Sequence, residues 1–271
     1  MTNQNAPFYR PTGDEVALFQ AAYAQRLPVM LVGPTGSGKT RFLEAMAHQA
    51  GQGSGSPGSP TPLTTISCHE DLTASDLVGR YLLDSNGTRW VDGPMTRAVR
   101  EGGICYLDEV VEARKDTVVL IHSLTDHRRT LPIAKLGDTV EAHPDFLLVI
   151  SYNPGYQSSV KDLKTSTRQR FVTIDFDYPE ELVEAEIVAV ESGVDADVAE
   201  RLAAVGARLR VLASDNRTDG PSTRLLVYAA ALIGHGVAEQ LACAQAFGVA
   251  LVEDAAHRRA ALDVIAAVVK P

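Results

Sequence analysis

Short apolar runs alternate with segments of helical periodicity through the first part of the chain. Apolar residues recur on one helical face in Asp14–Gln25 and Thr40–Ala50, which predicts two helices. Thr73–Val78 is typical of the start of a helix, with Asp76 at the capping-box position after Thr73. Five runs have the length and composition of buried strands: Val29–Val32, Leu63–Ser67, Ile104–Leu107, Phe146–Ile150 and Val172–Phe176. Strands that alternate with helices predict an α/β fold with a mostly parallel sheet flanked by helices.

The pattern changes at Pro179. Beyond it the strand signals stop, and alanine-rich helical segments follow at Glu180–Ser192, Ala196–Ala213, Ser222–Gly234, Val237–Ala255 and Ala256–Val269. We therefore predict two domains, an α/β domain over residues 1–178 and a small all-α domain over residues 179–271.

The overall composition narrows the class of protein. The 271 residues are 45% hydrophobic and 22% charged, which is ordinary globular usage and excludes disordered and fibrous chains. A formal net charge of −9 argues against non-specific binding to nucleic acid or to an anionic membrane. No apolar stretch approaches the length of a membrane helix, so we expect a cytoplasmic protein without membrane insertion. We expect Cys68, Cys105 and Cys243 to be reduced and buried.

A complete G-x-x-x-x-G-K-[ST] phosphate loop follows the first strand run and precedes a helix. Its members are Gly33, Pro34, Thr35, Gly36, Ser37, Gly38, Lys39 and Thr40. The glycines let backbone N–H groups turn toward the phosphates of a nucleotide, Lys39 adds a positive charge, and the Thr40 hydroxyl is a ligand for Mg²⁺. The sequence therefore predicts a site for ATP and Mg²⁺ at this loop.

Acidic and amide side chains follow two other strand runs. Asp108 and Glu109 come directly after a buried strand, at its carboxyl end, where ligands bind in open α/β sheets. Asp108 is the candidate for the Mg²⁺ shell, and Glu109 for orienting and polarising the attacking water. Asn153 follows the fourth strand run and is a candidate to hydrogen-bond that water or the γ-phosphate. The alternatives are an acidic turn for the pair and a simple turn for Asn153.

Arginines supply the remaining candidates for contact with a nucleotide. Arg168 and Arg170 lie just before the fifth strand run, where each is either solvated or a finger offered to a neighbouring subunit. Arg224 falls in the first turn of a predicted helix, where a cation is unfavourable to the helix dipole. This position indicates another role for Arg224, such as reaching the γ-phosphate.

In this order, these elements resemble the AAA+ ATPases, specifically the CbbQ/NirQ/NorQ group of the MoxR branch, over nearly the whole chain. The phosphate loop, Asp108–Glu109, Asn153, Arg170 and Arg224 match the Walker A, Walker B, sensor 1, arginine-finger and sensor 2 positions. The resemblance implies a Mg²⁺-dependent ATPase that forms a homo-oligomeric ring, a hexamer, with Arg168 as a second finger.

Two segments fit the hairpin insertions of that family. Residues 81–94 contain Asn86–Gly87 between two alternating stretches, the strongest hairpin signal in the chain, and residues 129–142 contain a turn at Gly137–Asp138. In the family such hairpins face the pore of the ring and act on a client. The alternative is that both are ordinary surface hairpins, with Trp90 anchoring its own.

Shorter segments favour the CbbQ proteins, which act as rubisco activases. These segments are Gly13–Phe19, Leu124–Arg129, Glu141–Phe146 and Asp175–Pro179. The resemblance then implies rubisco as the client, release of inhibitory sugar phosphates from it, and an adaptor with a von Willebrand factor A domain. The NirQ and NorQ proteins, which support nitric oxide reductase, share most of these segments and give the alternative client. Ser37, in place of a cysteine, and the long Gly/Ser/Pro loop Gly51–Pro62 depart from the family pattern without touching the chemistry.

Two other classes of function remain as alternatives from the residues alone. A nucleotide-dependent assembly switch without turnover would not need Glu109 to polarise a water. A DNA-dependent motor is disfavoured by the net charge of −9.

Overall fold

The computed structural model describes residues 6–53, 61–85, 87–154, 163–215, 220–248 and 255–269. Ser54–Pro60, in the predicted long loop, and Asn86, in the predicted hairpin turn, lie outside the described residues. Contacts divide the chain into two units. The first consists of Met1–Gly33, Lys39–Asn153 and Gln157–Phe176, and the second of Pro34–Gly38, Pro154–Tyr156 and Asp177–Pro271.

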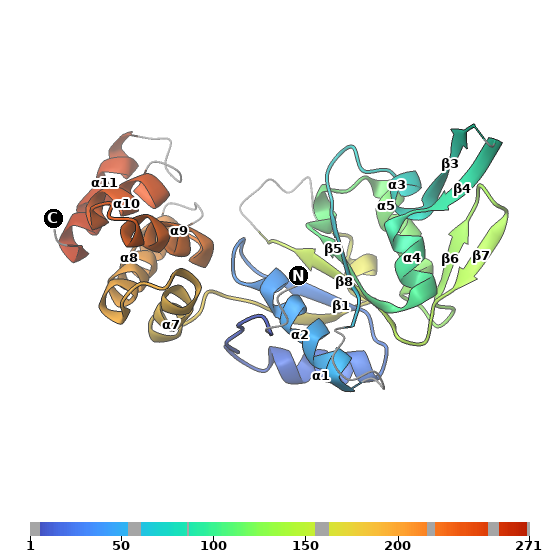
Figure 1. The fold of residues 1–271 in the computed structure, drawn as a ribbon, viewed down its shortest axis with the longest axis horizontal. Coiled ribbons are helices and arrows are strands. Elements are labelled where there is room, and N and C mark those ends of the chain that lie inside the picture. Colours follow the sequence, from blue (N-terminus) through green and yellow to red (C-terminus); the bar gives the residue numbers. More distant parts are fainter. Residues whose placement is uncertain are drawn as a thin grey trace. The chain divides into compact units, whose positions relative to one another are not determined.

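A five-stranded sheet forms the centre of the first unit, with the strand order β2-β5-β8-β1-β9. Figure 1 labels its three middle strands, β5, β8 and β1. Its strands are β1 (Val29–Val32), β2 (Leu63–Ser67), β5 (Gly103–Asp108), β8 (Phe146–Tyr152) and β9 (Val172–Asp175). All of its pairings are parallel, which confirms the predicted α/β fold. Parallel strands share one carboxyl edge, so the segments that follow β1, β5 and β8 meet there.

Helices cover both faces of this sheet. In β5, Ile104 and Tyr106 point to one core cluster, and Cys105 and Leu107 to the other, as strand alternation requires. The first face is covered by α1 (Glu15–Ala24) and α2 (Lys39–Gly53), and the second by α3 (Ala74–Val78), α4 (Pro94–Glu101) and α5 (Lys115–Leu120). The predicted capping box at the start of α3 is confirmed, because the Asp76 amide donates to Thr73 Oγ1 at 3.3 Å and the Thr73 amide donates to Asp76 Oδ2 at 3.0 Å.

Two antiparallel hairpins pack against α4 in the first unit (Figure 1). One pairs β3 (Gly79–Asp84) with β4 (Gly87–Asp92), and the other pairs β6 (Thr130–Ile133) with β7 (Asp138–Glu141). The first hairpin ends before Pro94, because Pro94 begins α4 at the N1 position that suits proline. Trp90 holds this hairpin together: its ring packs edge-on against Tyr81 at a centroid distance of 5.1 Å, and its Nε1 donates to Asp92 Oδ1 at 2.6 Å.

Short helical segments complete the first unit. They are the 3₁₀ turns η1 (Val110–Glu112) and η2 (Ile121–Leu124), and the helix α6 (Thr165–Arg168). The sequence pattern did not predict α4, α5 or α6.

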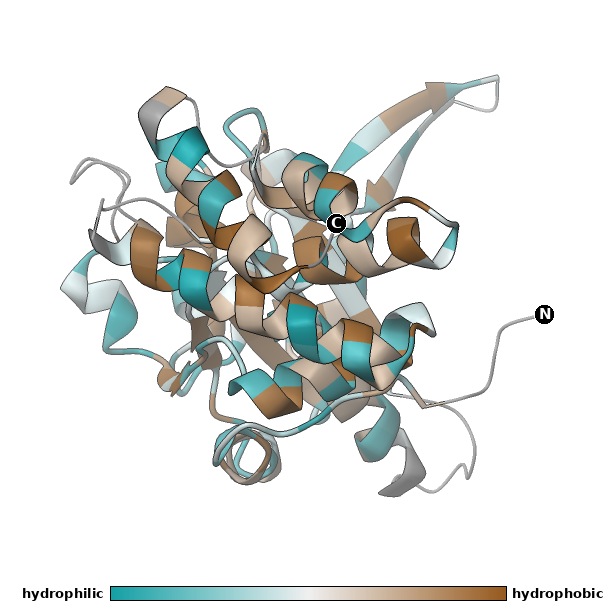
Figure 2. Ribbon diagram, turned by 90° about the vertical axis from the view of Figure 1, so that its left-hand side faces the viewer, coloured by the Kyte–Doolittle hydropathy of each residue, from teal (hydrophilic) through white to brown (hydrophobic). Residues whose placement is uncertain are grey.

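The second unit is helical over its described part. It contains α7 (Glu181–Ser192), α8 (Ala196–Asp215), α9 (Thr223–Gly234), α10 (Glu239–Cys243), the π-helical segment η3 (Ala244–Gly248) and α11 (Ala255–Val268). Figure 2 shows apolar and polar stretches on the same helices. The buried core of this unit includes Val188, Leu202, Leu226 and Ile265. The predicted continuous helix over Val237–Ala255 is instead α10 followed by η3, and residues 249–254 lie outside the described part.

Two features of composition can be compared with the expectations. Cys68, Cys105 and Cys243 are buried free thiols, as predicted. Among the helices of the described ranges, none is both long and apolar enough to cross a membrane.

Candidate active site

Strand pairing shapes the phosphate loop between β1 and α2. Gly33 has φ +156°, and a Cβ at this position would lie 2.2 Å from the backbone oxygen of Phe176, which follows β9. The chain approaches this closely because the Phe176 amide donates to the Val32 carbonyl at 2.6 Å, extending the β1–β9 ladder. Gly36 and Gly38 also have positive φ, at +74° and +91°. A side chain at any of these three positions would strain the loop.

Lys39 lies buried at the start of α2, with its ammonium folded back on the loop. Its Nζ donates to the Gly33 carbonyl at 2.8 Å. Burial lowers the pKa of Lys39 to about 8, while the negative charges of Asp108 and Glu109 act in the opposite direction. The loop therefore holds a cation in a poorly solvated position, where a polyphosphate would stabilise its charged form.

Asp108 ends β5 at the carboxyl edge of the sheet and receives two hydrogen bonds on one oxygen. The Tyr106 hydroxyl donates to Asp108 Oδ1 at 2.5 Å, and the Ser151 hydroxyl donates to the same atom at 2.7 Å. Burial, and then the bond to Asp108, raise the pKa of Tyr106, so the phenol remains a donor. These contacts fix the plane of the carboxylate and leave Oδ2 with the capacity to bind a cation.

Glu109 is held by the strand that neighbours β5 in the sheet. Its backbone has the left-handed conformation, with φ 55° and ψ 50°, which is uncommon outside glycine and typical of functional sites. The Glu109 amide donates to Ser151 Oγ at 2.7 Å, and Asn153 Nδ2 donates to Glu109 Oε1 at 3.1 Å. Ser151 of β8 thus holds the Glu109 backbone, and Asn153, directly after β8, orients the exposed Glu109 carboxylate.

Ser151 and Tyr106 are site residues that the sequence analysis did not identify. Leu107 pairs with Ile150 in the β5–β8 ladder, so the next residues along the two strands, Asp108 and Ser151, are also neighbours. Tyr106 precedes Asp108 by two residues, which places both side chains on one face of the strand. The pairing of the two strand ends would have been the signal for Ser151, and the two-residue spacing would have been the signal for Tyr106.

Cys68 also borders the site, where its amide donates to the Asp108 carbonyl at 2.9 Å. Burial, followed by the charges of Asp108 and Glu109, raises the pKa of the Cys68 thiol to about 12. The thiol therefore stays protonated at neutral pH and is a poor nucleophile.

The donor set fits a magnesium nucleotide. The Thr40 hydroxyl, which hydrogen-bonds to the Tyr106 side chain, and the Asp108 carboxylate are hard oxygen ligands, and Lys39 supplies charge for phosphate. Within the described residues, no group of three or more His, Cys, Asp and Glu side chains could hold a metal ion. Such a set suits Mg²⁺, which is usually bound by one or two protein ligands together with substrate phosphates and water.

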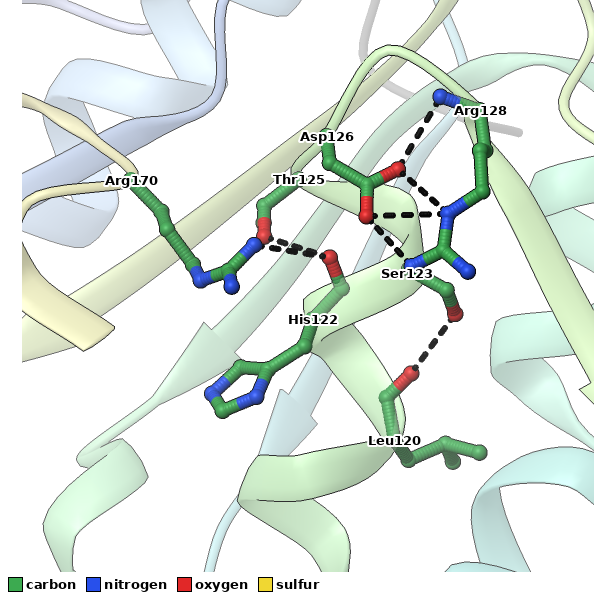
Figure 3. Close-up of polar contacts among 7 residues, drawn as sticks. All are labelled: Leu120, His122, Ser123, Thr125, Asp126, Arg128 and Arg170. Carbon is green, nitrogen blue, oxygen red and sulfur yellow. Dashed lines mark hydrogen bonds and ion pairs between the residues drawn. The ribbon is translucent and has the colours of Figure 1, made fainter. Parts of the chain in front are cut away.

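The candidate arginines do not all join this cluster. Arg170 is half-buried, and its Nη1 donates to the His122 carbonyl at 3.5 Å, a distance at the limit for a hydrogen bond. Figure 3 shows Arg170 directed at the backbone of η2, where Thr125 Oγ1 donates to the same carbonyl at 3.0 Å. Arg168 ends α6 with an exposed side chain, and Arg224 is exposed in the first turn of α9 in the second unit.

Comparison with known proteins finds similar families and relatives along nearly the whole chain. A model of the AAA domain (dynein-related subfamily) matches residues 28–171, and a model of the CbbQ/NirQ/NorQ C-terminal region matches residues 184–268. The chain is 58% identical to Protein CbbQ of Hydrogenophilus thermoluteolus, over 93% of this chain and 91% of that protein. It is 53% identical to Protein NorQ of Paracoccus denitrificans, over 97% and 94% of the two chains. It is 50% identical to the Denitrification regulatory protein NirQ of Pseudomonas aeruginosa, over 96% of each chain.

AAA membership supports an ATPase-type activity and nucleotide binding. The matches span both the sheet and the helical region. The chain therefore belongs to the CbbQ/NirQ/NorQ family of AAA proteins.

Proposed function

We propose that this protein hydrolyses Mg-ATP and uses the energy to remodel a protein client. The observation that carries this proposal is the hydrogen-bonded series Asp108–Ser151–Glu109–Asn153 at the carboxyl edge of the sheet. It orients one carboxylate that is suited to a cation and a second that is suited to a water, next to the Lys39 ammonium.

Each residue has a distinct role in this proposal. Lys39 and the backbone of the phosphate loop would bind the phosphates, and Thr40 and Asp108 would hold Mg²⁺, which would supply positive charge to neutralise the phosphates. Glu109 accepts a proton from the attacking water, and Asn153 holds Glu109 in place by the bond to Oε1. Contact with the γ-phosphate is the role that we propose for Arg224.

Turnover distinguishes this proposal from a nucleotide-dependent assembly switch. Glu109→Gln preserves the size of the side chain and its contact with Asn153, but removes the base. We expect steady-state hydrolysis to fall by about 10²-fold or more while Mg-ATP still binds. Wild-type protein that binds ATP without releasing phosphate, in the presence of its adaptor and client, would refute the ATPase and favour the switch.

The positions of Arg168 and Arg170 support a homo-oligomer. Arg170 is held within its own subunit by one long hydrogen bond, and Arg168 is exposed, so both can be redirected at little cost. We propose that Arg170, with Arg168 as a second finger, completes the site of the neighbouring subunit in a hexameric ring. Arginine fingers act on the charge that develops on the transferred phosphoryl group.

The proposed client is rubisco, from which the ring releases inhibitory sugar phosphates together with a von Willebrand factor A domain adaptor. Identity to Protein CbbQ over most of both chains supports this choice. Similar identity to Protein NorQ supports a second candidate, the activation of nitric oxide reductase. The β3–β4 hairpin offers the apolar Leu83, whose exposed fraction is 82%, as a contact for either client.

Recovery of carboxylase activity separates the two clients. Inhibitor-locked rubisco from the source organism is incubated with this protein, its co-expressed adaptor and Mg-ATP, with Lys39→Ala as the control. Recovery that requires both ATP and Lys39 supports the rubisco client. Intact ATP hydrolysis without recovery would refute that client and favour nitric oxide reductase, whose activity is then assayed in the same way.

A further inference from the structure

A buried carboxylate joins three helices within the second unit. Glu184 of α7 has no exposed surface, and it accepts hydrogen bonds from Arg210 of α8 at 2.6 and 2.7 Å. Its Oε1 also accepts a bond from the Thr223 hydroxyl at 2.6 Å. Because Thr223 is the first residue of α9, this carboxylate fixes the start of that helix.

Arg210 holds the segment before α9 as well. Its Nε donates to the Pro221 carbonyl at 2.9 Å, two residues before the helix begins. Its guanidinium also lies 3.9 Å from the centre of the Tyr178 ring, near the start of this unit. One side chain therefore ties together α7, the approach to α9 and the chain that leads in from β9.

The same unit includes residues 34–38 of the phosphate loop. The Tyr178 hydroxyl donates to the Thr35 carbonyl at 3.2 Å. A Cβ added to Gly36 would lie 2.4 Å from Cβ of Ser222, the residue that precedes α9. Within this unit, the residue that precedes α9 therefore lies close to Gly36, and Arg224 lies in the first turn of that helix.

We propose that Glu184, Arg210 and Thr223 are positioning residues that aim Arg224 at the γ-phosphate and so set the preference for ATP over ADP. This inference rests on the proposed function, in which Arg224 contacts that phosphate. A buried Arg–Glu pair is a weak source of stability but a strong geometric constraint. The Thr223 hydroxyl connects this constraint to the residue next to Arg224.

The test compares two substitutions at one position. Thr223→Val keeps the shape of the side chain but loses the hydroxyl, whereas Thr223→Ser keeps the hydroxyl. Affinities for Mg-ATP and Mg-ADP are measured by calorimetry in the Glu109→Gln background, so that ATP stays intact. We expect Thr223→Val to lower the ATP/ADP affinity ratio by about tenfold, the scale of one charge-assisted contact, and Thr223→Ser to change it by less than about twofold.

Arg224→Ala shows whether the effect passes through that arginine. It should lower the ratio at least as much as Thr223→Val, and the double variant should resemble Arg224→Ala alone. Effects that multiply in the double variant would overturn the proposal, as would a normal ratio in either single variant. Hydrogen exchange without nucleotide gives an independent readout. The amides of Leu225 and Leu226, which donate to the Ser222 carbonyl, should exchange faster in Thr223→Val, and unchanged exchange would also overturn the proposal.

A second Arg–Glu pair on α8 provides the matched control. Arg201 bonds Glu239 at 2.6 and 3.0 Å, but this pair joins α8 to α10 rather than to α9. Arg210→Lys should lower the ATP/ADP affinity ratio, and Arg201→Lys should leave it unchanged. Equal losses in the two variants would overturn the proposal, because they would show that the network affects only the general stability of the unit. Because the ratio needs no turnover, wild-type phosphate release tests the proposed function separately.

Discussion

Substitution of Ser151 by alanine should damage both the fold and the catalysis of the first unit. Ser151 has no exposed surface, and its hydroxyl donates to Asp108 and accepts from the Glu109 amide, both at 2.7 Å. Alanine removes both contacts and introduces no new steric demand. The effect therefore isolates the hydroxyl that joins the Asp108 carboxylate to the Glu109 backbone.

The magnitude follows from the two contacts. A hydrogen bond to a carboxylate contributes about 1.5–3 kcal/mol, and a buried amide that loses its acceptor costs about 1–3 kcal/mol. Water can reach part of the site because Glu109 is exposed, so we expect a loss of about 3 kcal/mol in the free energy of unfolding rather than the sum of the upper values. Misplacement of Glu109 should lower kcat by about 10²-fold. KM should change little, because the phosphate loop keeps its contacts.

Urea unfolding followed by fluorescence measures the first effect. The single tryptophan, Trp90, belongs to the first unit and reports on that unit. Ser123→Ala is the matched control: its hydroxyl makes one bond of 3.5 Å, to the Leu120 carbonyl (Figure 3), and we expect a loss below about 0.5 kcal/mol. If Ser151→Ala loses no more than the control and keeps wild-type kcat, the hydroxyl does not position the Asp108 carboxylate and the Glu109 backbone.

Two further predictions concern charge at the site. Burial lowers the pKa of Lys39 to about 8, and bound phosphates favour its protonated form. Binding of Mg-ATP near pH 8.5 should therefore be accompanied by the uptake of about three quarters of a proton at Lys39, and binding near pH 6.5 by almost none. Calorimetry in buffers of different ionisation enthalpy measures this uptake. Binding heats at pH 8.5 that do not depend on the buffer would contradict the prediction. Arg170→Ala should leave the unfolding free energy within about 0.5 kcal/mol, because its bond to His122 is long, yet depress turnover when mixed with wild type. Unchanged turnover in stable mixed rings would exclude a shared finger.

The central sheet could be predicted because its signals are local. Each buried strand is a short apolar run with clear breaks, and the phosphate loop is a continuous motif whose spacing is set by its chemistry. Asp108 and Glu109 were identified because two acids directly follow a buried strand. Ser151 was not, because a serine at a strand end has no signal of its own and gains its role from the β5–β8 register.

The helical unit was predictable in its periodicity but not in its polar interior. Apolar spacing located α7, α8, α9 and α11, yet it assigns charged residues to the solvent face by default. Glu184 violates that default, since its charge is buried and satisfied by Arg210, which follows it by 26 positions. The π-helical turns of η3 were missed for a related reason, because five residues are too few to separate a π from an α period.

Each unit contains its own polar network, centred on one buried hydroxyl. Ser151 orients the Asp108 carboxylate and the Glu109 backbone in the first unit, and Thr223 fixes the start of the helix that carries Arg224 in the second unit. The two hydroxyls share no hydrogen-bond partner among the described residues, so their effects should be independent. We expect the losses in kcat/KM of Ser151→Ala and Thr223→Val to multiply in the double variant to within about twofold. A double variant no worse than Ser151→Ala alone would instead show that Thr223 acts through the carboxylates, and that the two networks form one unit.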